Sequence, residues 1–149
     1  MNKSADFILY LDAASNTTKK ILASNSSFIE RAMALKAIPD TIELYTGDGI
    51  ARMVVPSTLD GLKLNSIGAH VFTAGSSGSN TIMLYNETKS VDILTTGVII
   101  EVSETDSSTS GTPALISANN TVNTADVLRI DVDTKSTGAK GLEVRMTFK

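Results

Sequence analysis

Two stretches in the last third of the sequence alternate apolar and polar residues with a period of two. Between Asp126 and Asp133, the apolar residues Leu128, Ile130 and Val132 alternate with charged ones. From Gly141 to Lys149, apolar residues at positions 142, 144, 146 and 148 repeat the pattern. Successive side chains of a strand point to opposite faces, so each stretch predicts a strand with one apolar face. Such strands are typical of antiparallel sheets that pack on one side. We expect these two to pair as a closing hairpin.

The sequence from about residue 50 onward predicts many short strands separated by polar loops. The loops are rich in Gly, Ser, Thr and Asp, most clearly at 73–79, 103–111 and 134–140. No helical periodicity interrupts this part of the chain. Short strands at such spacing predict a mainly β fold, an antiparallel β-sandwich of the jelly-roll type. The candidate strands are 51–55, 62–64, 67–73, 81–85, 90–94, 97–102, 114–116, 128–132 and 142–148.

The first 40 residues have a different character and are expected to form a separate segment. Phe7 to Leu11 is strand-like, residues 15–18 are turn formers, and Lys19 to Ala23 is a return strand, so the pattern predicts a hairpin. A two-stranded hairpin is marginal alone in water and must pack on something. We therefore divide the chain into an attachment or oligomerisation segment, residues 1–40, and a β-sandwich domain, residues 41–149. A short strand-like run, Ile42 to Tyr45, follows the boundary.

A helix is predicted over residues 28–38, within the first segment. Ser27 and Glu30 have the spacing of a capping box, in which each side chain bonds to the other's backbone amide. Phe28, Ala32 and Leu35 form an apolar stripe at helical spacing. Pro39 is expected to end the helix near residue 38. A helix this short needs a partner surface, so the stripe joins Phe7, Leu9 and Leu11 as the candidate attachment or oligomer contacts.

Composition excludes several classes of function. The chain has 149 residues, 42% of them apolar, which is enough for one domain with a real core. Its net charge is −3, without a cluster of Lys and Arg, which argues against nucleic-acid binding. Cysteine is absent, so no disulfide or thiolate metal site is possible. No run is long and apolar enough for a signal peptide or membrane span, so we expect no membrane insertion and synthesis in a cytoplasm.

No group of residues has the pattern of a catalytic site, and we expect no enzyme activity. His70 is the only histidine, and no nucleophile or orienting acid is suggested near it in the sequence, so a sheet-surface or interface role is favoured. Asp126, Asp131 and Asp133 could suggest calcium, which takes six to eight oxygen ligands. Because Arg129 shares the face of Asp131 and Asp133, we interpret these charges as alternating charges on a solvated surface. We therefore predict no metal and no cofactor.

Two parts of the sequence resemble bacteriophage structural proteins. Ala5 to Ala14, followed by a small-residue turn and Lys19 to Ser24, resembles a hairpin near the start of phage fibre and tail-associated proteins. A second set of segments resembles a jelly-roll domain found in phage head-fibre, capsid-decoration and tail proteins, which is similar in outline to carbohydrate-binding modules. These segments are Ile67–Gly75, Ile82–Asn86, Val91–Leu94, Asp126–Asp133 and Ala139–Leu142. The resemblance spans residues 5–38 and 62–149.

The resemblance implies a virion structural protein whose partners are phage capsid or tail proteins. It also implies a homo-oligomer, by analogy a trimer. The chain is short and has no repeat or heptad shaft, which favours a compact head-attached or adaptor protein over a full tail fibre. The N-terminal segment would attach to the particle, and the sandwich would project outward. The alternative is a module of the receptor-binding apparatus that binds host surface glycans through loops 73–80 and 103–111.

Overall fold

The structure, a computed structural model, describes residues 7–12, 17–22 and 30–149. The chain divides after Glu30 into two compact units, the second of which is Arg31–Phe148. Each unit is described by itself.

The first unit contains an antiparallel hairpin. Its strands are β1 (Phe7–Asp12) and β2 (Thr17–Leu22). They pair along their whole length, from Phe7 opposite Leu22 to Asp12 opposite Thr17. The predicted hairpin is thereby confirmed. Of its predicted turn, residues 15–18, the last two belong to β2 and the first two lie outside the described residues.

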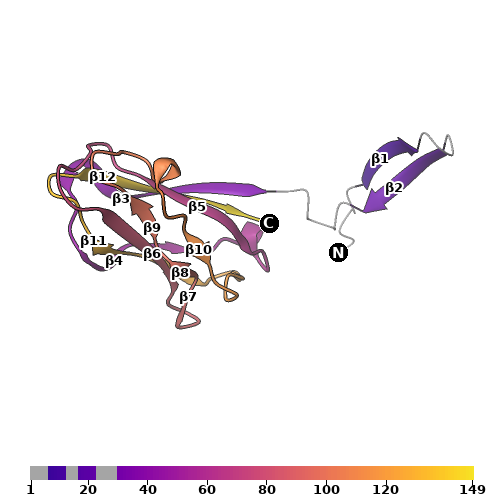
Figure 1. Ribbon diagram of the computed structural model, residues 1–149. Helices are drawn as coiled ribbons and strands as arrows, with labels where there is room; N and C mark the ends of the chain where they lie inside the picture. Colours follow the sequence, from indigo (N-terminus) through magenta and orange to yellow (C-terminus); the bar gives the residue numbers. More distant parts are fainter. Residues whose placement is uncertain (1–6, 13–16, 23–29) are drawn as a thin grey trace. The chain divides into compact units, whose positions relative to one another are not determined.

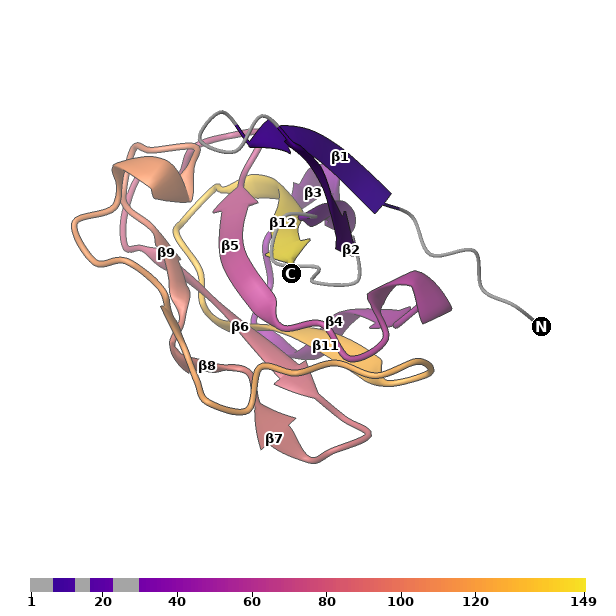
Figure 2. The same ribbon diagram turned by 90° about the vertical axis from the view of Figure 1, so that its right-hand side faces the viewer.

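The second unit is a sandwich of two antiparallel sheets. One sheet has the order β3-β12-β5, and the other has the order β4-β11-β6-β7 with β9 also paired to β6. In the view of Figure 2, β5, β12 and β3 form one layer and β6, β11 and β4 the other. A short pair, β8 with β10, lies beside them (Figure 1). The predicted β-sandwich is confirmed. The bounds are β3 Arg31–Glu43, β4 Gly47–Val54, β5 Leu64–His70, β6 Asn80–Asn86, β7 Val91–Asp92, β8 Leu94–Thr96, β9 Val98–Ile100, β10 Leu115–Ile116, β11 Val127–Thr134 and β12 Lys140–Phe148, with two 3-10 turns, η2 Ser57–Leu59 and η3 Ser107–Thr109.

The core lies between the two sheets and is filled by alternate residues of the central strands. In β11 and β12, the apolar positions that alternate in the sequence are all buried. Strand β6 contributes Ile82 and Leu84 on the same principle. The alternation therefore predicted the inward faces correctly, because the strand period of two sends every second side chain to one side. The buried set of the last two strands is Leu128, Ile130, Val132, Leu142, Val144, Met146 and Phe148.

The two alternating strands do not form a hairpin, so that prediction was wrong. Strand β11 pairs with β4 and β6, whereas β12 pairs with β3 and β5. Each is thus flanked on both sides within its own sheet, and the link at residues 135–139 carries the chain from one sheet to the other. The apolar faces of both strands belong to the same core. Alternation specifies which face is buried but not which strand lies alongside.

The predicted helix over residues 28–38 is also wrong. Positions 28 and 29 lie outside the described residues, and from Arg31 the chain is strand β3. In β3 the half-buried Met33, Leu35 and Ala37 alternate with exposed neighbours, a period of two that also satisfies part of a helical stripe. Pairing with β12 decides between the two readings, because the pairs supply hydrogen bonds that a short helix would have to make alone. Pro39 is tolerated because β3 is an edge strand.

The correction moves residues 31–40 into the sandwich. These residues form most of β3 and bring Ile38 into the core, fully buried. The division of the chain therefore falls after Glu30 rather than after residue 40. The predicted short strand at Ile42 to Tyr45 is in part the end of β3, which reaches Glu43.

Candidate functional site

On the outer face of the β3-β12-β5 sheet, the two rows through Thr147 and Arg145 carry mostly small side chains, and the next row carries Lys36, Glu143 and His70. Thr147 lies between Ala32 of β3 and Ser66 of β5, and Arg145 lies between Ala34 and Gly68. The hydroxyls of Ser66 and Thr147 are 2.7 Å apart and share a hydrogen bond. Since five of these six positions are small, the sheet surface stays open around the single long side chain, Arg145.

A loop from the opposite sheet covers one end of the β5 edge. The backbone N–H of Val71 donates to the Thr105 carbonyl at 2.8 Å, and that of Ala69 donates to Ser107 Oγ at 2.9 Å. The short η3 turn follows, with Asp106 as its N-cap accepting from the Ser108 N–H at 3.0 Å. The loop 103–111 is therefore bound to β5 by backbone groups and is held in a defined place.

Asp106, His70 and Arg145 form a charged cluster at this contact. The carboxylate oxygen Oδ2 of Asp106 lies 3.2 Å from His70 Nδ1 and also accepts from Arg145 Nη2. Burial alone would raise the pKa of Asp106, but hydrogen bonds from Ser108 and His70 and the charge of Arg145 outweigh it and lower the pKa to about 2. Asp106 is therefore ionised at neutral pH and holds both basic partners.

Gly68 makes this cluster possible. A Cβ at position 68 would lie 3.3 Å from Ser107 Oγ and 3.9 Å from Arg145 Nη2. The guanidinium therefore crosses β5 over a residue without a side chain to reach Asp106 on the far side. The cluster joins β12, β5 and the loop, although Asp106 lies 36 residues from His70 and 39 from Arg145.

A groove of about 940 Å³ runs beside this cluster. Hydroxyl groups of the loop and of the sheet line it together with apolar residues of β9 and β10. Its lining is Ala32, Met33, Ala34, Asn65, Ser66, Ile67, Gly68, Val98, Ile99, Asp106, Ser107, Ser108, Ser110, Thr112, Pro113, Ala114, Ile116, Arg145, Met146 and Thr147. No aromatic ring lines it among the described residues. The groove can accept a ligand that offers apolar groups together with hydrogen-bonding groups.

The chemistry of the cluster is that of charge and hydrogen bonding. His70 and Asp106 form an imidazole–carboxylate pair, as in hydrolase triads. Within the described residues, however, no hydroxyl is hydrogen-bonded to the second ring nitrogen of His70. The nearby Ser107 hydroxyl oxygen instead accepts from the Ala69 N–H. His70 lies on the sheet surface, about one third exposed, as its position in the sequence suggested.

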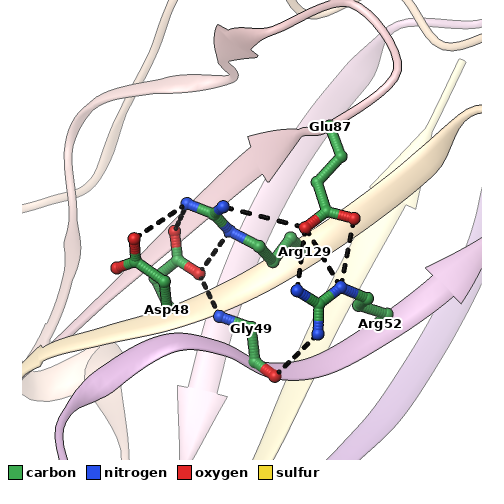
Figure 3. A network of polar contacts seen from close by, with 6 residues as sticks. Asp48, Gly49, Arg52, Glu87 and Arg129 are labelled. Atoms are coloured by element: carbon green, nitrogen blue, oxygen red, sulfur yellow. Dashed lines mark hydrogen bonds and ion pairs between the residues drawn. The ribbon is translucent and has the colours of Figure 1, made fainter.

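The outer face of the other sheet carries a second polar network, shown in Figure 3. Arg129 of β11 donates to both carboxylate oxygens of Asp131, each at 2.7 Å. The same carboxylate accepts from the Gly49 N–H at 2.7 Å. Glu87 accepts from Arg52 at 3.0 Å and lies 3.7 Å from Arg129. The hydrogen bond to Asp131 is the main cause that raises the pKa of Arg129.

This network corrects the prediction that Asp131 is a solvated charge. Its side chain is only 7% exposed and its oxygens are occupied by Arg129 and the Gly49 backbone. The ring of Tyr85 supports the arrangement, since the Arg129 guanidinium lies 4.4 Å from its centroid. Asp131 is therefore a structural partner that fixes the β4 backbone to β11.

The three acidic residues considered for calcium have different surroundings. Asp126 is buried and accepts from Asn86 Nδ2 at 2.9 Å, with Lys89 Nζ at 3.1 Å. Asp133 is exposed as a residue, but partial desolvation of its carboxylate, together with the charges of Asp131, Asp48 and Asp92, raises its pKa. In the part of the chain that the structure describes, no three His, Asp or Glu side chains are grouped so that they could hold a metal ion.

The predicted attachment residues are distributed over both units. Phe7, Leu9 and Leu11 take alternate positions of β1. Phe28 lies outside the described residues. Ala32 is exposed on the outer face of β3, whereas Leu35 is half-buried and packs against the core. These last two therefore point to opposite faces, and the apolar stripe expected of a helix is absent from residues 31–38.

The residues that sequence reasoning missed are those of the groove cluster. Alternation placed Arg145 on the outward face, but nothing in the sequence indicated that it crosses Gly68. Asp106 was one acidic residue in a polar loop, without a distinguishing pattern. The sequence could have indicated this cluster only if the pairing of Gly68 with Arg145 had been known. A glycine opposite a long basic residue leaves room for that residue to reach a neighbouring loop.

Comparisons with known proteins do not add a family to these observations. No protein-family model matches the chain, and neither the curated proteins nor the solved structures that were searched gave a match. In the described ranges, no helix is long and apolar enough to cross a membrane.

Proposed function

We propose that this chain is a non-enzymatic bacteriophage virion protein, of the head-fibre or capsid-decoration type. Its N-terminal segment would attach to capsid or tail proteins, and its β-sandwich would be displayed outward. The observation that carries the proposal is the division after Glu30, because the sandwich of Arg31–Phe148 contains a core of its own. The hairpin of the first unit is then available for a separate task.

The ends of the sandwich support a display role. Arg31 pairs with Phe148, so the strand that enters the sandwich and the strand that ends it lie together at one end. The links near Leu44, Phe72 and Ala139 meet at the opposite end, where Leu44 N–H donates to the Ala139 carbonyl at 2.9 Å. Exposed apolar side chains, among them Tyr45 and Phe72, belong to these links. One end is therefore suited to a tether and the other to contact with the surroundings.

The attachment would depend on apolar burial by the hairpin. Phe7, Leu9 and Leu11 occupy alternate positions of β1, and each apolar side chain that becomes fully buried contributes about 1.5–3 kcal/mol. Many copies on one particle would add avidity. The resemblance to phage fibre and decoration proteins implies a homo-oligomer, by analogy a trimer, and supports a location on the virion.

Deletion of the first unit tests the proposal. A variant that lacks residues 1–30 keeps the whole of β3 and should remain a folded sandwich that no longer binds virions in a co-sedimentation assay. Removal of residues 1–38 is not an adequate test, because it would delete eight residues of β3 and destabilise the sheet. Binding of the 31–149 fragment to virions at full-length affinity would contradict the proposal.

A double substitution within the full chain provides a finer test. Leu9→Ser with Leu11→Ser should abolish virion binding while the melting temperature of the sandwich stays unchanged, since the second unit has its own core. The matched control is Ile8→Ser with Tyr10→Ser, on the other side of β1. Equal loss in both variants would show that the hairpin matters but that the chosen face is wrong.

A further inference from the structure

Along the edge of β5 that faces away from β12, most backbone groups are hydrogen-bonded to loops, but within the described residues one residue is not. The hydrogen-bond pattern shows which residue this is. Ala69 and Val71 donate their N–H groups to the loop rather than to β12. In an antiparallel strand, alternate residues direct both N–H and C=O to the same side. The register with β12 is regular from Glu143 to Thr147, so Ile67 must also direct its N–H and C=O away from β12. These two groups face the free edge.

The edge is closed on both sides of Ile67. Toward the start of β5, the Leu64 N–H donates to the Asn120 carbonyl at 2.9 Å, and the Leu64 carbonyl accepts from Asn120 Nδ2 at 3.1 Å. Toward its end, Ser107 accepts from Ala69. Within the described residues, no group pairs with Ile67 on this side. The gap is therefore one hydrogen-bonding residue wide and opens into the groove that Ile67 lines.

The groove offers two further features beside this gap. Its apolar wall consists of Val98 and Ile99 from β9 together with Ala114 and Ile116. At its rim lies the Arg145 guanidinium, whose side chain is 48% exposed. Arg145 Nη2 donates to Asp106, which leaves other N–H groups of the guanidinium at the open side. The rim therefore offers N–H donors to a second carboxylate beside that of Asp106.

We propose that this gap is a docking site for an extended segment of a partner protein, an apolar strand that carries an acidic residue. The segment would add to β5 beside Ile67 and exchange two backbone hydrogen bonds with it. Its apolar side chains would pack on the Val98 and Ile116 wall, and its carboxylate would meet Arg145. A glycan fits less well, because no aromatic ring lines the groove among the described residues. The N–H and C=O of Ile67, by contrast, are placed to pair with the backbone of an added strand.

Amide exchange and peptide titration of the full-length chain test the site. In the free protein, the Ile67 amide should exchange with solvent at least tenfold faster than those of Ala69 and Val71. The blocked peptide acetyl-Thr-Val-Thr-Val-Asp-amide should shift the Ile67 amide resonance saturably and slow its exchange. Two analogues, N-methylated at the valines or at the threonines, expose the role of the backbone. One of them should bind at least tenfold more weakly, because its methyl groups replace the N–H that faces Ile67.

Variants of the groove separate specific docking from general adsorption. Ala114→Trp should fill the groove and weaken peptide binding at least tenfold, whereas Thr58→Trp, exposed and outside the groove, should not. A peptide that ends in asparagine instead of aspartate should bind severalfold more weakly to the native protein. Arg145→Gln should abolish that preference.

Several outcomes would overturn the proposal: no saturable shift at Ile67, equal binding of both N-methylated analogues, or saturable binding of maltotetraose with the same resonance shifts. The last of these would assign the groove to glycans. None of these measurements involves virions, so their failure leaves the attachment role untouched.

Discussion

The outer faces of the two sheets differ in whether their charged side chains pair with one another on the sheet. On the β4-β11-β6 face, long side chains satisfy one another, with Arg129 held by Asp131 and Arg52 by Glu87. On the β3-β12-β5 face, Ala32, Ala34, Ser66 and Gly68 leave the surface around Arg145 bare, and this arginine reaches outward to a loop. Long charged side chains that pair with one another stabilise the fold, whereas an open face with a partly engaged cation can bind something else.

The largest effect is expected from Asp131→Ala. The substitution removes the partner of a mostly buried guanidinium and the acceptor of the Gly49 N–H. Breaking a fully buried pair costs about 3–5 kcal/mol, and Arg129 keeps Glu87 nearby, so we expect about 2–3 kcal/mol in guanidinium denaturation. Arg52→Ala, in the exposed part of the same network, serves as the control and should destabilise the protein much less, because exposed ion pairs are screened by solvent. Equal costs would contradict the distinction between the two positions.

Asp106→Asn should have an intermediate and pH-dependent effect. The folded-state pKa of Asp106, about 2, lies below its ordinary value of 3.8, so its contribution is present above pH 4 and is lost as the pH falls toward 2. We expect a loss of about 1–2 kcal/mol at pH 6, which is discounted for partial exposure. Denaturation curves of the two proteins should converge near pH 2, and a constant difference across this range would refute the role assigned to the carboxylate.

Gly68→Val should cost about 1 kcal/mol and disturb the loop contact. Its Cβ would lie 3.3 Å from Ser107 Oγ, and the branches of the valine would displace the Arg145 guanidinium. Proton exchange of the Ala69 amide should then become faster, since its acceptor is Ser107. Ser66→Val, on the same strand and face, is the matched control and should leave that amide protected.

The smallest effect is expected on the bare face. Ala34→Lys places a charged side chain on an exposed position of β3 and should change the free energy of unfolding by about 0.5 kcal/mol or less. Thermal denaturation would show whether the melting temperature stays near that of the native protein. A loss of several kcal/mol would mean that this face is covered and would remove the contrast between the two sheets.

The sequence predicted which side chains of a strand are buried better than it predicted which strands pair with each other. Leu128 to Val132 and Leu142 to Phe148 were assigned to the core because a period of two is a local property. The assignment of residues 31–38 to a helix failed because Met33, Leu35 and Ala37 are compatible with both periods, and only pairing with β12 distinguishes them. The groove cluster could not be predicted, because Asp106 meets His70 and Arg145 only after a loop crosses between the sheets.

The position of β12 has a consequence for how the protein is made. It is the last strand of the sandwich and yet the middle strand of its sheet, between β3 and β5. During synthesis, β3 and β5 have no partner between them until residues 140–148 leave the ribosome. Until then, the apolar side chains and unpaired backbone groups of both strands stay exposed. Nascent β proteins in this state are prone to aggregate and to need chaperones.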